Sequence, residues 1–228
     1  MRLHPESENC VEESCAWPLS RARTLGNKTF YQRTGKRILD AACATAGLVL
    51  LAPFLLIVAV LVKFTSSGPV LFRQPRAGRK GKIFLVMKFR SMAGTGKSGL
   101  HITVSGDPRI TFVGAILRKF KIDELPQLWN VLRGEMSLVG PRPEVERYVR
   151  GYTDQQYRIL EARPGITDPA SIAYRHEEEV LASHPDPENH YRTVLLPHKL
   201  FLNLEYVENI SFRRDVSLIL ETIRSIFS

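Results

Sequence analysis

Cysteine is scarce in this chain of 228 residues, which contains only Cys10, Cys15 and Cys43. Three cysteines at irregular spacing do not make a disulfide framework, and no C-x-x-C pair indicates a zinc site. A secretory signal is also lacking, because the first 30 residues hold no short apolar stretch followed by a cleavage site. These absences predict a reducing, cytoplasmic setting.

Negative charge is in the minority, with 23 acidic against 32 basic residues and a formal net charge of +9. Such an excess suits nucleic acid, anionic lipid or phosphorylated substrates, and by itself favours none of them. Residues 1–36 form a polar tail that is acidic early and basic later. The choice among these ligands therefore depends on motifs further along the chain.

Charge is absent altogether from Ala41 to Val62, and Pro53 lies inside this apolar run. About 20 apolar residues are enough to cross a bilayer as a helix. Three interpretations are open: a buried core helix, a straight transmembrane span, or a re-entrant hairpin. The hairpin would bend at Pro53, because proline removes a backbone donor and clashes with the preceding turn.

Basic residues flank the run on both sides, and this favours the hairpin. By the positive-inside tendency both flanks belong in the cytoplasm, and only a hairpin satisfies both. The flanking residues are Arg33, Lys36 and Arg37 before the run, and Lys63, Arg73, Arg76, Arg79, Lys80 and Lys82 after it.

Two further segments, residues 112–120 and 212–227, combine an apolar stripe at helical spacing with basic neighbours. Such helices suit the membrane interface, although amphipathic helices packed on a core show the same pattern. Strands are expected at Val70–Phe72 and Lys82–Phe89. We therefore predict a membrane-associated α/β protein of mostly helical content, with a Pro-broken re-entrant helix, a small irregular sheet and interfacial amphipathic helices.

A glycine-rich stretch matches G-x-G-x-x-G at Gly94, Gly96 and Gly99 and nearly matches a P-loop. Both motifs need a helix that starts there and holds phosphate with its first amides. The residues that follow, LHITVSGDP, are rich in β-branched side chains and end in a turn signal. We interpret the stretch as a surface loop rather than a nucleotide site.

An acidic pair, Asp123 and Glu124, precedes a helical pattern that Gly134 is placed to end. Asp123 is a natural N-cap for this helix, and the positive end of the helix dipole, with nearby cations, would keep both carboxylates ionised. An ionised carboxylate can act as a nucleophile or hold Mg²⁺. The alternative is a pair that only caps the helix and complements its dipole.

Three basic residues are candidates for binding phosphate. Arg142 stands between two prolines in GPRP, and a guanidinium on a stiff loop suits bidentate phosphate contact, although a structural ion pair is also open. Lys88 and Arg90 end a predicted strand, and their two-residue spacing turns them to one face. Cations, carboxylates and an anchor together indicate a phosphate substrate at a bilayer surface.

The segments KFRSM, DPRIT, LRKFKIDELPQLWNVLRGEMSLVGPRP and RPGIT, in this order, resemble the bacterial sugar transferases, the monotopic polyprenol-phosphate phosphoglycosyl transferases. The resemblance covers about residue 34 to the C-terminus. With no further apolar run before residue 38, the chain resembles the short, minimal class. The family implies transfer of a sugar 1-phosphate from a UDP-sugar to undecaprenyl phosphate, with release of UMP, at the start of a surface glycan or glycoconjugate pathway.

Carried over by position, the resemblance assigns Asp123 as the nucleophile that holds the phosphosugar covalently, near the required Mg²⁺. Glu124 is its acidic partner. Arg118 and Arg142 match phosphate-binding positions, and Lys88 and Arg90 in KFRSM are further candidates.

The resemblance divides the chain into a polar tail (residues 1–36), a re-entrant membrane helix (37–65) and a catalytic domain (66–228) docked on the cytoplasmic face of the bacterial inner membrane. One departure concerns the donor, since PGIT is commonly followed by glycine and tryptophan in the family, whereas this chain reads PGITDPAS. The alternative is a non-catalytic membrane scaffold that binds polyprenol phosphate or anionic lipid. We expect no nucleic acid partner, and no feature of the sequence specifies an oligomeric state.

Overall fold

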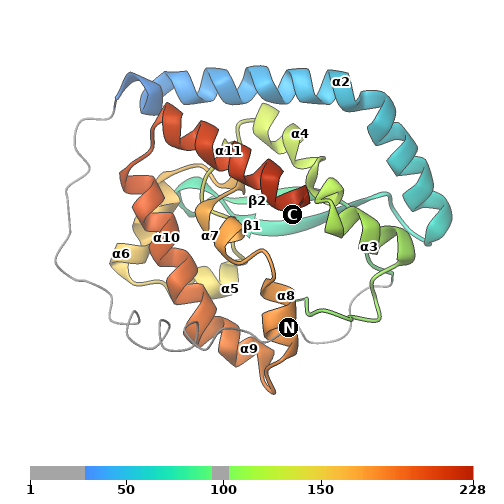
Figure 1. Cartoon of the computed structure of the whole chain (residues 1–228). Coiled ribbons are helices and arrows are strands. Elements are labelled where there is room, and N and C mark those ends of the chain that lie inside the picture. Colours follow the sequence, from blue (N-terminus) through green and yellow to red (C-terminus); the bar gives the residue numbers. More distant parts are fainter. Residues whose placement is uncertain (1–28, 94–102, 228) are drawn as a thin grey trace.

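The computed structural model describes residues 29–93 and 103–227. A wide helical turn, η1 (Tyr31–Gly35), leads into the long helix α2 (Lys36–Thr65), which contains the apolar run and Pro53. Figure 1 shows α2 changing direction partway along, so that it covers two sides of the domain. An internal proline bends a helix in this way because one backbone hydrogen bond is lost. Within the described part of the chain, Tyr31–Thr65 is the one helical run long and apolar enough to cross a membrane.

Two small sheets follow α2. Strands β1 (Leu71–Ala77) and β2 (Ile83–Phe89) form an antiparallel hairpin around the tight turn η2 (Arg79–Gly81). Both predicted strands are confirmed, and β1 extends further than expected because an edge strand tolerates Pro75. The second sheet pairs β3 (Ser137–Val139) parallel to β4 (Gly165–Thr167).

Short helices connect and cover these strands, so the expected mostly helical fold with a small sheet is confirmed. Between β2 and β3 lie α3 (Phe112–Lys119), the 3₁₀ turn η3 (Ile122–Glu124) and α4 (Gln127–Leu132). Between β3 and β4 lie α5 (Glu146–Val149), α6 (Asp154–Tyr157) and η4 (Arg158–Glu161). After β4 come α7 (Pro169–Ala173), α8 (Glu177–Ala182), α9 (Pro187–His190), η5 (Tyr191–Leu195), α10 (Leu196–Glu208) and α11 (Phe212–Phe227).

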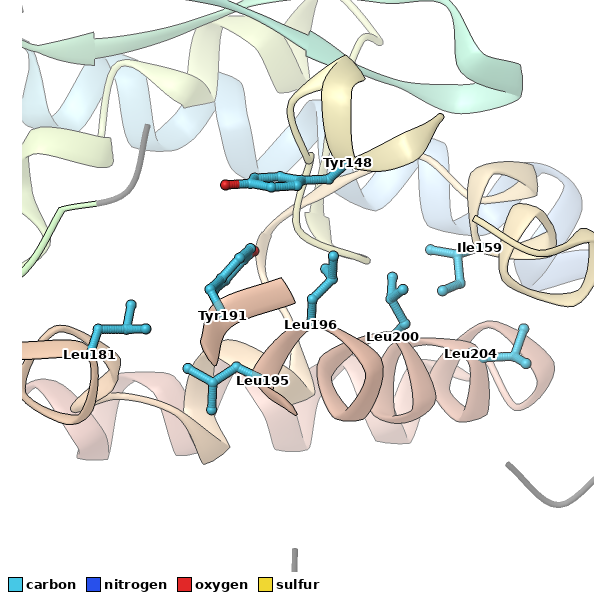
Figure 2. Close-up of a cluster of buried hydrophobic side chains, with 8 residues drawn as sticks. All are labelled: Tyr148, Ile159, Leu181, Tyr191, Leu195, Leu196, Leu200 and Leu204. Carbon is cyan, nitrogen blue, oxygen red and sulfur yellow. The ribbon is translucent and has the colours of Figure 1, made fainter. Parts of the chain in front are cut away.

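Buried apolar clusters join these elements. In the cluster of Figure 2, the ring of Tyr148 packs over that of Tyr191, with centroids 5.2 Å apart, above the leucines of η5 and α10. A second cluster, beneath the first half of α2, consists of Ala44, Phe84, Val86, Leu128, Val131 and Met136. A third, beneath its second half, consists of Val58, Val62, Phe89 and Leu117. The last two clusters hold α2 against β2, α3 and α4.

Polar contacts attach the start of α2 to the rest of the domain. The Asp215 carboxylate, on α11, accepts hydrogen bonds from the hydroxyls of Tyr31 and Tyr206, each at 2.6 Å, and pairs with Lys36. At the next residue of α2, the Arg37 guanidinium donates to the last carbonyl groups of α4 at 2.6 and 2.7 Å. The beginning of the apolar helix is therefore fixed to both α4 and α11.

The outer face of α2 is apolar and exposed. Leu50, Leu56 and Phe64 are 76%, 67% and 86% exposed. Exposed apolar side chains also recur at helical spacing on α3 and its C-cap (Phe112, Ile116 and Phe120) and on α11 (Phe212, Val216, Leu220 and Ile223). Such faces mark contacts with membrane or protein. The exposure contradicts the interpretation of the run as a buried core helix, and the hairpin stays a prediction.

Candidate active site

The acidic pair, Asp123 and Glu124, lies in the turn η3 between α3 and α4. The chain enters this turn through Lys121, whose backbone is left-handed with φ of 55°. That conformation costs a non-glycine residue about 1 kcal/mol, so it persists only where the surroundings enforce it. The turn buries both carboxylates, which are 5% exposed at Asp123 and 7% at Glu124.

Glu124 is paired with two cations. Its Oε1 accepts a hydrogen bond from the Lys88 ammonium at 2.6 Å and another from the Arg142 guanidinium at 2.9 Å. Burial by itself would raise the pKa of this carboxyl, but Arg142 and Lys88 outweigh burial and hold the pKa well below its usual range. Glu124 is therefore ionised, and it fixes the positions of both cations.

Asp123 has different surroundings. Its Oδ1 is buried and accepts no hydrogen bond from any described residue. Burial and the charge of Glu124 raise the pKa of Asp123, although Lys88, Arg118 and Lys121 act in the opposite direction. A buried acceptor without a partner costs about 1–3 kcal/mol. This oxygen therefore has free lone pairs for a ligand. Leaving them unpaired lowers the stability of the fold.

One expectation about the pair is wrong. Asp123 does not cap a helix, because α4 begins only at Gln127, behind Pro126, and has no side-chain cap. Burial also raises the pKa of Asp123, an effect that opposes the nearby cations. Gly134 does end α4, with the expected left-handed φ of 79°.

Arg142 reaches Glu124 from a stiff loop that follows β3. At the start of this loop, a Cβ on Gly140 would lie 2.3 Å from the carbonyl oxygen of Arg163, so only glycine fits. The flanking prolines fix φ on both sides of Arg142. The Arg142 side chain remains 33% exposed, so part of the guanidinium is open to a ligand.

Arg118, at the end of α3, pairs with Glu178 on α8. Its charge also acts on the pKa of Asp123, which places it within electrostatic reach of the pair. Sequence reasoning missed Glu178, because 60 positions separate it from Arg118 and no local pattern links the two.

Arg90 is a predicted site residue that the structure does not bring to the pair. Its guanidinium donates to the carbonyl oxygens of Val62 (3.1 Å), Ser66 (2.6 Å) and Pro69, and to the Ser66 hydroxyl (2.9 Å). Arg90 therefore closes the C-terminal end of α2, where carbonyl groups lack helical partners. Lys88 and Arg90 therefore have different partners, since Lys88 contacts Glu124 and Arg90 contacts the end of α2.

A magnesium ion could use the free oxygen of Asp123. No three His, Cys, Asp or Glu side chains gather as a metal cluster within residues 29–93 and 103–227. Mg²⁺ nevertheless needs only one or two carboxylates when substrate phosphates and waters complete its shell. The residues present fit a metal held jointly with a phosphate substrate. The glycines at 94, 96 and 99 lie outside the described residues, as does most of the polar tail.

Comparison with known proteins finds a protein family that this chain matches. The model for "Bacterial sugar transferase" matches residues 31–228. A UDP-N-acetylgalactosamine-undecaprenyl-phosphate N-acetylgalactosaminephosphotransferase of Aeromonas hydrophila is 37% identical over 198 residues, which cover 85% of this chain and 44% of the relative. A UDP-glucose:undecaprenyl-phosphate glucose-1-phosphate transferase of Caulobacter vibrioides is 37% identical over 199 residues, which cover 85% of this chain and 70% of the relative.

The exopolysaccharide production protein ExoY of Rhizobium meliloti is 34% identical over 207 residues, and here the match covers 84% of each chain. The chain thus spans less than half of the Aeromonas relative and most of the other two.

Proposed function

The chain belongs to the bacterial sugar transferase family, and we propose that it transfers a sugar 1-phosphate from a UDP-sugar to undecaprenyl phosphate, with Asp123 as the nucleophile. The contrast within the acidic pair carries this proposal, because Glu124 is paired twice while Asp123 keeps a buried oxygen without a partner. The printed names of the Aeromonas and Caulobacter relatives supply the substrate classes. Since those two names give different sugars, we propose a UDP-sugar as the donor and do not specify the sugar.

In the first step, a carboxylate oxygen of Asp123 attacks the phosphorus that carries the sugar. A phosphorus–oxygen bond forms to Asp123, the bond to the bridging oxygen breaks, and UMP leaves with the electron pair. A carboxylate of raised pKa is a better nucleophile once it is ionised. Arg142 and Lys88, held in place by Glu124, offset the negative charge on the transferred phosphoryl group.

In the second step, a phosphate oxygen of undecaprenyl phosphate attacks the same phosphorus. The bond to Asp123 breaks, the aspartate is regenerated, and a sugar diphosphate lipid is released. Because donor and acceptor use the site in turn, the kinetics are ping-pong. Glu124 acts by position, since a carboxyl whose pKa is held so low is a poor base.

Mg²⁺ is the proposed cofactor, and Asp123 is the residue that would hold it, together with the donor phosphates. When bound, the ion would offset charge on the diphosphate and on the departing UMP. The cations of the site remain necessary with the metal present, because the diphosphate carries more than one negative charge.

We propose that α2 enters the cytoplasmic leaflet of the bacterial inner membrane as a hairpin bent at Pro53. Both ends of α2 are tied to one domain, through Lys36 and Asp215 at the start and through Arg90 at the end. A straight span would put these ends on opposite sides of the bilayer and break one set of contacts. The exposed apolar faces of α2, α3 and α11 support docking on the same leaflet.

The reaction can be tested with the purified full chain in detergent, Mg²⁺, undecaprenyl phosphate and a panel of UDP-sugars. We expect at least one donor to yield UMP, and Asp123→Asn to abolish the release. Asp154→Asn, which changes an exposed aspartate on α6, is the matched control and should keep the activity. Binding of undecaprenyl phosphate with no UMP from any donor would instead identify a non-catalytic scaffold.

A further inference from the structure

A groove of about 570 Å³ lies beside the β-hairpin, and it is not part of the candidate active site. Ile83, Leu85 and Met87 of β2 contribute to its lining. Successive residues of a strand point to opposite faces. Lys88, which contacts Glu124, therefore belongs to the other face of β2.

Cations surround this groove. Its basic lining residues are Arg73, Arg79, Lys82 and Arg133, and its acidic lining residue is Glu135. Glu135 pairs with Arg133 at 3.3 Å, which leaves the other three cations in excess. The Nε of Arg79 donates to the carbonyl oxygen of Glu161 at 3.0 Å, so this guanidinium is held in place.

A further cation lies beside the groove, because the Nε of Arg163 donates to the carbonyl oxygen of Gly134, a lining residue, at 3.0 Å. Burial, and then the charges of Arg79 and Arg37, lower the pKa of the neighbouring Arg163. An anion in the groove would relieve this repulsion.

Apolar side chains complete the lining. Trp129 of α4 is 49% exposed and lines the groove. Ile83 and Leu85 are 43% and 49% exposed. An indole beside basic residues and exposed aliphatic carbon is typical of a membrane–water interface. The lining therefore fits a ligand with an anionic head and an apolar body.

The groove also lies close to the apolar helix. Leu128, which precedes Trp129 on α4, packs in the same cluster as Ala44 of α2. Arg37 of α2 donates to the carbonyl oxygens of Val131 and Leu132 at the end of α4. A single short helix therefore separates the groove from the helix with the exposed apolar face.

We propose that this groove binds the phosphate headgroup of an anionic membrane phospholipid, with phosphatidylglycerol as the probe. Basic pockets beside membrane helices bind such headgroups, and each nearby Lys or Arg strengthens the attraction. This ligand is distinct from donor and acceptor, and the binding does not depend on the role of Asp123.

Trp129 is a local reporter, because Trp17→Phe leaves it as the single tryptophan of the chain. The full chain in uncharged detergent micelles is titrated with phosphatidylglycerol or phosphatidylcholine. We expect a saturable change in Trp129 fluorescence with phosphatidylglycerol alone. Arg79→Gln combined with Lys82→Gln should raise the midpoint about 30-fold, which corresponds to about fivefold for each charge removed. Lys82→Gln alone, the milder change, should raise it about fivefold.

The matched control combines Arg150→Gln with Arg192→Gln, two exposed changes outside the groove, and should keep the original midpoint. An equal response to phosphatidylcholine, or an unchanged midpoint in the groove variants, would overturn the proposal. Saturation by glycerol phosphate at the same concentrations would also overturn it, since the ligand would then be a soluble phosphate. Release of UMP is measured in parallel, so failure of the proposed reaction is seen separately.

Discussion

Asp123 and Glu124 are adjacent in one turn, yet their carboxylates have opposite surroundings. Glu124 Oε1 lies 2.6 Å from the Lys88 ammonium and 2.9 Å from the Arg142 guanidinium, while the buried Oδ1 of Asp123 has no partner within the described residues. The Glu124 carboxylate stabilises the site, whereas the Asp123 carboxylate stays unpaired and available for chemistry, at a cost in stability. The predictions below follow from this division.

Neutral isosteres of the pair should change stability in opposite directions. A pKa raised by folding means that the ionised form destabilises the fold above that pKa, so Asp123→Asn should raise the melting temperature at pH 7.5. Because folding lowers the pKa of Glu124, its carboxylate stabilises the fold at any pH above the pKa that it has in the unfolded chain. This stability is lost as the pH falls through the pKa of the folded state. Glu124→Gln should therefore lower the free energy of unfolding, by roughly 1–3 kcal/mol.

Thermal melting of both variants in detergent tests this. The expected shift is about 2–4 °C for each kcal/mol in a chain of this size. Two shifts of the same sign would contradict the division of roles.

The rate of UMP release should depend on the ionisation of Asp123. Because burial and Glu124 raise its pKa, kcat/KM should rise with pH through a value above that of an ordinary aspartate. Lys88 lowers this pKa, so Lys88→Gln should move the acidic limb to higher pH. Initial rates at low donor concentration, from pH 4.5 to 8, measure the limb. A rate that does not change on the acidic side of this range in either protein, as an ordinary aspartate would give, would refute the assignment.

Arg90 should act on stability rather than on substrate binding. Arg90→Lys keeps the charge but loses the fork that reaches the carbonyl oxygens of Val62, Ser66 and Pro69. We expect a loss of roughly 1–3 kcal/mol in the free energy of unfolding, with KM for the donor unchanged. Arg150→Lys, at an exposed position, is the control. If Arg90 contacts substrate phosphate instead, KM will rise while the melting temperature stays the same.

The hairpin predicts that both ends of α2 face the cytoplasm. Thr34→Cys and Ser67→Cys introduce exposed thiols before and after the apolar run, in a background where the native cysteines are serine. Neither thiol should react with an impermeant maleimide added to intact spheroplasts, and both should react after lysis. Ser183→Cys, at an exposed position on the domain, marks the cytoplasmic side. Reaction of one α2 flank from outside would establish a straight span.

Local features of this fold could be read from the sequence, and long-range partners could not. The end of α4 at Gly134 and the hairpin strands follow from backbone rules that neighbouring residues impose. The pairing of Arg118 with Glu178 and the use of Arg90 at the end of α2 depend on which segments the tertiary fold brings together. The raised pKa of Asp123 could not be read from the sequence for the same reason, because its largest cause is burial, which depends on the tertiary fold.

Intact mass of the protein after incubation with an accepted UDP-sugar and Mg²⁺, without undecaprenyl phosphate, tests the nucleophile most directly. We predict a mass increase of one phosphosugar, located on the peptide that contains Asp123 and lost when undecaprenyl phosphate is added. An active enzyme that gains no such mass, or an Asp123→Asn variant that gains it equally, would contradict the account.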